Sequence, residues 1–169
     1  MTAKRLTSVG ILAALCFVAT YIHIPVNFGG SNAMIHLGTT AIYLSAVLLG
    51  KDAGWAGAIG CALFDILDPA YAAWVIPTFI IKGLQGYTAG RISFMGNKKG
   101  SSFTQNLLAF TAGAIVSLAG YFLVDWLVFY NLPVALQKTA ASLITSAIGI
   151  GVSIILVPII VPAIKKAKM

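Results

Sequence analysis

The chain has 169 residues, of which 59% are hydrophobic and only 9% are charged. Soluble domains carry about 25% charged residues, so this composition excludes a soluble globular protein and indicates that the lipid bilayer is the solvent. A helix crosses the bilayer with roughly 20 mainly apolar residues. The length therefore predicts a single membrane domain, residues 1–169, with six spans.

The apolar runs predict the spans in chain order. The first run, residues 6–22, follows Lys4 and Arg5 and is expected to be a true span and not a signal peptide. Residues 26–35 are rich in Asn, Gly and Ser, which is typical of a loop. The other five predicted spans are residues 37–49, 53–67, 71–92, 106–130 and 136–164. We therefore expect an all-α integral membrane protein with six transmembrane helices, of which the second and third are short.

The basic residues predict the orientation, because the cytoplasmic segments of membrane proteins are enriched in Lys and Arg. Eleven Lys and Arg against four Asp give a net charge of +7, and they lie in short gaps between apolar runs, unlike a nucleic-acid-binding surface. With both termini cytoplasmic, Lys138 is the only basic residue outside, and Lys82 falls within a span. The residues then on the cytoplasmic side are Lys4, Arg5, Lys51, Arg91, Lys98, Lys99, Lys165, Lys166 and Lys168.

Small residues at a spacing of four allow close helix contact inside a membrane. Gly10 and Ala14 form such a pair in the first predicted span, and Ala147 and Gly151 form one in the sixth. A longer series in the third span is Gly54, Ala58 and Ala62. For each series, packing within the protein is favoured over contact with a partner.

Charged residues inside apolar runs are candidates for function, since a charge at the bilayer centre costs at least about 2.5–3.5 kcal/mol on insertion scales. Lys82 lies near the middle of the fourth predicted span, and Asp65 lies at the outer end of the third. For Lys82 a structural role, either snorkelling or pairing with an acid, is as favoured as a functional one.

Asp125 lies near the outer end of the fifth predicted span, among aromatic residues. Trp126 is adjacent, Tyr121 precedes it by one helical turn, and Tyr130 follows. This pattern favours a small pocket for a polar ring. The alternative, an aromatic belt at the membrane interface, explains Trp126 and Tyr130 but not Asp125.

Polar and aromatic residues gather on the predicted outer side, which suits a protein that binds a solute from outside. The expected substrate-binding residues are Asn32, His36, Asp68, Tyr71, Trp74, Lys82, Tyr121, Asp125, Trp126, Asn131 and Gln137.

The sequence lacks the motifs of an enzyme. His23 and His36 do not form an HExxH pattern, and no phosphate-binding GxxxxGK[ST] loop occurs. Cys16 and Cys61 lie in apolar runs and are expected to be buried core residues. We therefore expect no catalytic residues, no metal site, no cofactor and no nucleic-acid partner.

Four segments resemble the S components of energy-coupling factor (ECF) vitamin importers, and the riboflavin-type group is the most similar. They are IHLGTTAIYL at residues 35–44, LLGK at 48–51, AGWAGAIG at 53–60 and FIIKGLQG at 79–86. The resemblance covers essentially the whole chain, including its length and its six expected spans.

The resemblance implies a substrate-binding subunit of the prokaryotic plasma membrane that captures a vitamin or vitamin precursor at the extracellular side. Its implied partners are a transmembrane coupling subunit, contacted here through Gly10 and Ala14, and two cytoplasmic ATPases. Pyridoxine or hydroxymethylpyrimidine is the favoured substrate, followed by pantothenate and riboflavin. The alternatives are a stand-alone small-solute transporter and a membrane assembly protein that transports nothing.

Overall fold

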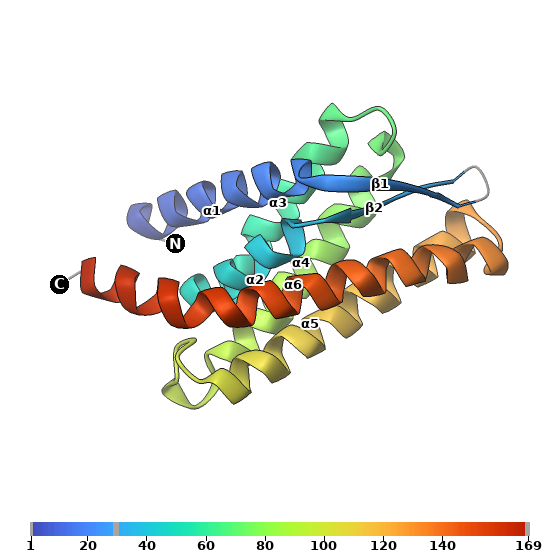
Figure 1. Ribbon diagram of the computed structural model, residues 1–169. Helices are drawn as coiled ribbons and strands as arrows, with labels where there is room; N and C mark the ends of the chain where they lie inside the picture. Colours follow the sequence, from blue (N-terminus) through green and yellow to red (C-terminus); the bar gives the residue numbers. More distant parts are fainter. Residues whose placement is uncertain (1, 29–30, 168–169) are drawn as a thin grey trace.

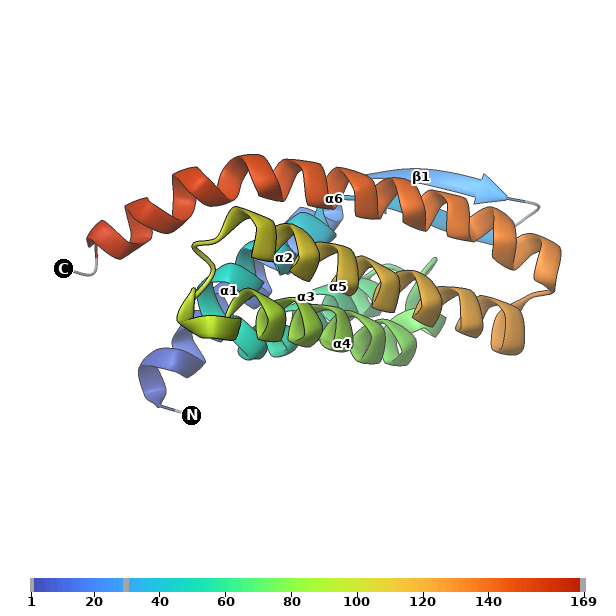
Figure 2. The same ribbon diagram turned by 90° about the horizontal axis from the view of Figure 1, so that it is seen from below.

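The computed structural model describes residues 2–28 and 31–167, most of which lie in helices. The helices pass between two ends of an elongated bundle, and the start of the first helix and the end of the last lie at the same end (Figures 1 and 2). We call this the terminal end. The α-helices are α1 (Ala3–Tyr21), α2 (Gly38–Leu49), α3 (Ala53–Leu67), α4 (Val75–Ser93), α5 (Phe103–Val124) and α6 (Leu132–Ala167).

Short elements turn the chain at the ends of these helices. Three of them are 3₁₀ turns, and the fourth continues α5 as a turn of π-helix. In chain order they are η1 (Gly50–Asp52), η2 (Ala72–Trp74), η3 (Met95–Asn97) and η4 (Asp125–Phe129).

Four stretches of the described chain are long and apolar enough to cross a membrane, which confirms a mostly helical membrane protein. Helices α2 and α3 together make up one of them, and α4 is not among them because Lys82, Gln85 and Arg91 lower its mean hydropathy. The count of six spans and the cytoplasmic termini stay predictions. The four stretches are Ala3–Tyr21, Gly38–Leu67, Phe103–Phe129 and Leu132–Ile164.

The all-α prediction is wrong for the segment between α1 and α2, which was expected to be a loop. Strands β1 (His23–Phe28) and β2 (Ser31–His36) form an antiparallel hairpin that pairs His23 with His36. The hairpin extends from the end of α1 and packs along α6 (Figure 1). The sequence carries a signal for it, because a Gly-Gly pair between two short runs favours a hairpin connection.

An apolar core fills the half of the bundle nearer the terminal end. The rings of Tyr43 and Phe110 stack there with centroids 4.6 Å apart, among Val47, Val157 and Val161. Tyr43 also accepts a hydrogen bond of 3.1 Å from the side-chain amide of Gln85. Its hydroxyl is therefore satisfied although the residue is fully buried.

Helices α3 and α4 approach each other very closely in this half. A Cβ atom on Gly90 would collide with the backbone of Gly50, and one on Gly54 would lie 2.8 Å from the carbonyl oxygen of Gly83. Small residues let helix backbones come into van der Waals contact in a membrane. The contact of Gly54 and Ala58 with α4 fits the internal packing expected for the small residues of α3.

Candidate functional site

A cavity occupies the half of the bundle away from the terminal end. It encloses about 610 Å³, including its open mouth, between β2 and the helices α2 to α6. The residues that line it are Asn32, Ala33, Met34, His36, Thr39, Asp65, Tyr71, Trp74, Thr78, Lys82, Ser117, Tyr121, Asp125, Lys138, Ser142, Thr145 and Ser146.

Helical spacing brings these side chains together from distant parts of the chain. Residues four apart, or three and four apart in turn, share one face of a helix. Thr78 and Lys82 have this spacing in α4, and Ser117, Tyr121 and Asp125 have it from α5 into η4. In α6 the same spacing gives a polar face to the cavity, made by Lys138, Ser142, Thr145 and Ser146.

Asp65 is the acid at the end of α3, and only 1% of its surface is exposed. Its carboxyl group receives a hydrogen bond from the hydroxyl of Thr78, which in turn accepts one of 3.2 Å from Tyr121. The second oxygen, Oδ2, has no hydrogen-bond partner among the described residues. Since a buried carboxylate oxygen is costly when unsatisfied, Oδ2 is free to accept a hydrogen bond from a ligand.

Lys82 is buried beside the cavity on α4. Its Nζ donates hydrogen bonds of 3.2 Å to Oγ1 of Thr39 and 3.1 Å to Oε1 of Gln85, and it lies 5.4 Å from the centre of the Tyr121 ring. An ammonium group has three N–H donors, so these two bonds leave one for a ligand.

Asp125 and Lys138 form a buried ion pair across the corner between α5 and α6, with 2.7 Å between Oδ1 and Nζ. The Lys138 ammonium also lies 4.5 Å from the ring centre of Trp74 and 4.3 Å from that of Tyr130, within the range of cation–π attraction. These contacts join the start of α4 to the α5–α6 corner. Both charges are thus compensated within the protein.

The β hairpin closes one side of the cavity. His36 is buried at its base, and its Nδ1 accepts a hydrogen bond of 3.1 Å from the backbone N–H of Gly38. Because Nδ1 is the acceptor, the proton of the neutral ring is on Nε2. Tyr71 and Thr145 hold β2 in place by donating to the carbonyl oxygens of Ala33 and Met34, at 3.5 and 3.4 Å.

The structure brings seven of the expected substrate-binding residues to this cavity. They come from β2, from η2 with the residue before it, and from α4 and the end of α5, which are far apart in sequence. These seven are Asn32, His36, Tyr71, Trp74, Lys82, Tyr121 and Asp125.

The other four expected residues, Asp68, Trp126, Asn131 and Gln137, do not line the cavity. Asp68 and Asn131 cap local turns, where their side chains accept hydrogen bonds from the backbone of Ala70 and Val134. Trp126 is 42% exposed and packs beside Phe122, and Gln137 is exposed. Trp126 and Gln137 are adjacent in sequence to residues that do line the cavity, and Asp68 and Asn131 lie in the connections between helices. Closeness in sequence therefore suggested all four.

The list of expected residues omitted Asp65, Lys138 and most of the hydroxyl side chains of the cavity. The charge of Asp65 within an apolar run was a usable signal, and so was the helical spacing of Lys138, Ser142, Thr145 and Ser146. Among the described residues there is no group of three or more His, Cys, Asp or Glu that could hold a metal ion.

Gly10 and Ala14, the expected contact for a coupling subunit, both lie on the exposed face of α1. A Cβ added to Gly10 would meet no atom within 4 Å. These two residues are therefore not used for packing inside the protein, and their role in contact with a partner stays a prediction.

Comparison with known proteins identifies the family. Residues 1–164 match the family described as "ECF-type riboflavin transporter, S component". A relative from Pyrococcus woesei, described as an uncharacterized protein in a gap 3' region, is 31% identical over 117 residues, covering 69% of this chain and 74% of the relative. The chain therefore belongs to the ECF-type riboflavin transporter S component family, whose members are substrate-binding membrane subunits of vitamin transporters and not catalytic themselves.

Proposed function

We propose that this protein captures a B vitamin or a vitamin precursor at the extracellular side of the prokaryotic plasma membrane. The cavity is the observation that carries this proposal. It holds two lysines and two aspartates, all buried, in a protein with only 9% charged residues. Charged groups inside a membrane protein mark binding or transport sites.

The cavity lining suits a heteroaromatic ring with hydroxyl groups. Tyr71, Trp74 and Tyr121 line the cavity and supply aromatic contact surface for a ring, and serine and threonine hydroxyls bond either donors or acceptors. Pyridoxine and hydroxymethylpyrimidine remain the first candidates, and riboflavin gains support from the family's description. Pantothenate ranks lower, because the lining already holds two aspartates for its two lysines, and a carboxylate would add an unbalanced negative charge.

The proposed topology has six spans with both termini in the cytoplasm. The first residues of α1, the end of α6, and the α2–α3 and α4–α5 connections share the terminal end of the bundle (Figure 1). All the basic residues except Lys82 and Lys138 lie in these segments of the sequence or within a few residues of them, as expected for a cytoplasmic side. The short helices α2 and α3 are largely covered by their neighbours, so they need not match the bilayer thickness by themselves.

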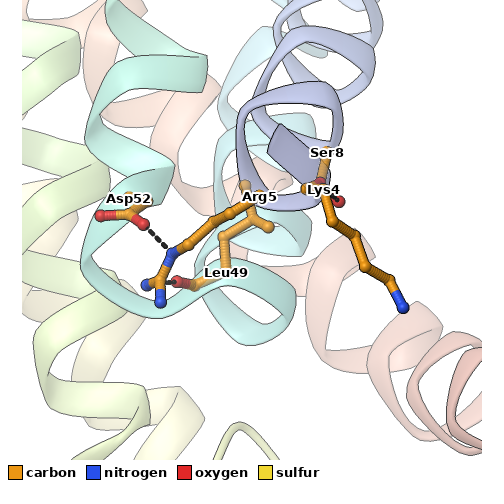
Figure 3. Close-up of polar contacts among 5 residues, drawn as sticks. All are labelled: Lys4, Arg5, Ser8, Leu49 and Asp52. Atoms are coloured by element: carbon orange, nitrogen blue, oxygen red, sulfur yellow. Dashed lines mark hydrogen bonds and ion pairs between the residues drawn. The ribbon is translucent and has the colours of Figure 1, made fainter. Parts of the chain in front are cut away.

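Delivery of the vitamin would require a transmembrane coupling subunit and two cytoplasmic ATPases, with Gly10 and Ala14 as the proposed contact. Figure 3 shows how the start of α1 is held beside η1: Arg5 forms an ion pair with Asp52 and donates a hydrogen bond to the carbonyl oxygen of Leu49. This attachment presents the small residues of α1 on an anchored helix.

The contact is tested by Gly10→Leu in cells that express the coupling subunit and ATPases. We expect uptake to be abolished while the purified subunit binds its vitamin with unchanged affinity, because Gly10 is exposed and a Cβ added there meets no atom of this protein within 4 Å. Normal uptake would contradict the contact. Uptake that persists when the coupling subunit is deleted would instead favour a stand-alone transporter.

The proposed function is tested on the purified protein in detergent. Any compound that co-purifies is released by denaturation and identified by mass, and pyridoxine, hydroxymethylpyrimidine, pantothenate and riboflavin are then titrated by calorimetry. A stoichiometric compound of vitamin size with saturable binding is the expected result. No bound compound and no binding of any vitamin or precursor, with the protein shown to be folded, would contradict the proposal.

A further inference from the structure

The ionisable side chains of the cavity cancel one another in charge. Lys82 and Lys138 are balanced by Asp65 and Asp125. The other titratable groups among the lining residues are His36, whose Nδ1 accepts a backbone hydrogen bond, and the hydroxyls of Tyr71 and Tyr121. The net charge of the lining stays zero even if a proton moves from Lys82 to Asp65, because such a transfer removes one positive and one negative charge.

The four charges differ in how completely the protein satisfies them. Lys138 and Asp125 compensate each other directly, and two aromatic rings flank the lysine. Lys82 has two hydrogen-bond partners and one N–H donor to spare. Oδ2 of Asp65 has none, although the residue is almost completely buried. Of these four charged groups, Asp65 thus keeps one free acceptor for a ligand and Lys82 keeps one free donor.

We propose that the cavity selects a vitamin of zero net charge that donates a hydrogen bond to Oδ2 of Asp65, and that it rejects the phosphate ester of the same vitamin. This inference rests on the proposed function and assigns the charge and donor pattern of its substrate. A phosphate group carries about −1.5 to −2 charges at pH 7. The charges of the described lining residues sum to zero, so the ester would bring an unbalanced negative charge into a buried site.

A ring N–H, an amino group or a hydroxyl of the ligand supplies the donor. The Thr78 hydroxyl accepts a hydrogen bond from Tyr121 and hydrogen-bonds the Asp65 carboxyl group, and both Thr78 and Asp65 line the cavity. Asp65 is thereby a specificity-determining residue.

The test uses the full chain in detergent and three matched pairs of probes: riboflavin, pyridoxine and hydroxymethylpyrimidine, each with its own phosphate ester. Affinities are measured by calorimetry. We expect the vitamin that binds to do so at least 100-fold more tightly than its ester. An ester that binds within threefold of its vitamin would overturn the charge selection and leave the proposed function intact. Failure of all six probes on folded protein would overturn this inference, and the identification of a co-purifying compound would then decide the proposed function separately.

The variant Asp65→Asn separates the donor contact from simple steric exclusion of the phosphate. It removes one negative charge and replaces one acceptor oxygen with an amide donor, in nearly the same shape. We expect affinity for the vitamin to fall at least tenfold, whereas affinity for the ester stays the same or rises, so that the ratio between them shrinks. Vitamin affinity within twofold of the wild type would overturn the role of Asp65.

Asp68→Asn is the matched control, because Asp68 lies three residues further along the chain and outside the cavity. We expect it to change neither affinity. If Asp65→Asn does not fold, the comparison of each vitamin with its ester on the wild-type protein still decides the inference.

Discussion

The two halves of α4 show how one helix serves two different purposes. After Lys82, its inward side chains are mostly small, and Gly86 and Gly90 let the backbone of α3 and η1 approach within contact distance. Before Lys82, Thr78 faces a cavity, and the buried Trp74 of η2 lines the same cavity just before the helix begins. The terminal half thus gains stability from close packing, while the other half gives up packing to place unsatisfied polar groups where a solute can reach them.

The largest effect is expected in the packed half, from Gly90→Leu. The side chain would overlap the backbone of Gly50. Overpacking costs about 1–3 kcal/mol even where neighbouring side chains can shift, so overlap with backbone that cannot move aside is expected to prevent folding. We expect loss of folded protein, measured as aggregation during size-exclusion chromatography in detergent.

Gly83→Ala on the same helix is the control for this prediction. A Cβ at Gly83 meets its nearest atom, the Cβ of Ala58, at an ordinary 3.4 Å. This variant is expected to fold and bind normally. If Gly90→Leu were as stable as Gly83→Ala, the packed half would not be the source of stability.

The next largest effect is expected at the α5–α6 corner, where Asp125→Leu would leave Lys138 buried without its partner. Removing one member of a buried ion pair typically costs about 3–5 kcal/mol. We expect a clear fall in melting temperature in detergent. The double variant Asp125→Leu/Lys138→Met, which removes both charges, should recover most of the loss. A double variant less stable than the single one would contradict the structural role of the pair.

A smaller effect, on binding and not on folding, is expected for Lys82→Met in the cavity half. The variant keeps the length of the side chain and removes its donors. Hydrogen bonds to charged groups contribute about 1.5–3 kcal/mol, so vitamin affinity should fall roughly 10- to 100-fold in a titration. Lys98→Met, in the exposed η3 connection at the terminal end, is the control and should bind as the wild type does. Equal affinities for the two variants would remove Lys82 from the site.

The smallest effects are expected for Trp126→Phe and Gln137→Ala. Both side chains are exposed near the α5–α6 corner and do not line the cavity. Affinity in the same titration should change by less than twofold. A tenfold loss in either variant would show that the binding site extends beyond the cavity.

The sequence predicted the helices well because an apolar run of this length in a bilayer satisfies its own backbone hydrogen bonds by forming a helix. The hairpin was missed because the Asn, Gly and Ser residues around Gly29 are equally common in loops and in hairpin turns, and pairing across residues 23–36 depends on the support of α6. Gly10 and Gly54 each begin a series of small residues four apart, but Gly10 is exposed and Gly54 packs against α4. Only the structure shows this difference.

The candidate site was partly predictable, because charge inside an apolar run is a strong signal. Lys82 and Asp125 were found in this way. The partner of Asp125 was not, since Lys138 lies thirteen residues further along the chain and was assigned to the outer surface. The hydroxyl face of α6 was also missed, because Ser and Thr are frequent in membrane helices as internal packing residues.

The most direct test of the central claim, that a vitamin binds in the cavity half, uses the three tryptophans as local reporters. Trp74 lines the cavity, whereas Trp55 and Trp126 do not. The variant Trp55→Phe/Trp126→Phe retains Trp74 alone, and Trp55→Phe/Trp74→Phe retains Trp126 alone, with binding to each confirmed by calorimetry. On titration with the vitamin that co-purifies, we expect saturable quenching of Trp74 and little change at Trp126. Quenching of Trp126 with no response from Trp74 would contradict the assignment of this cavity as the binding site.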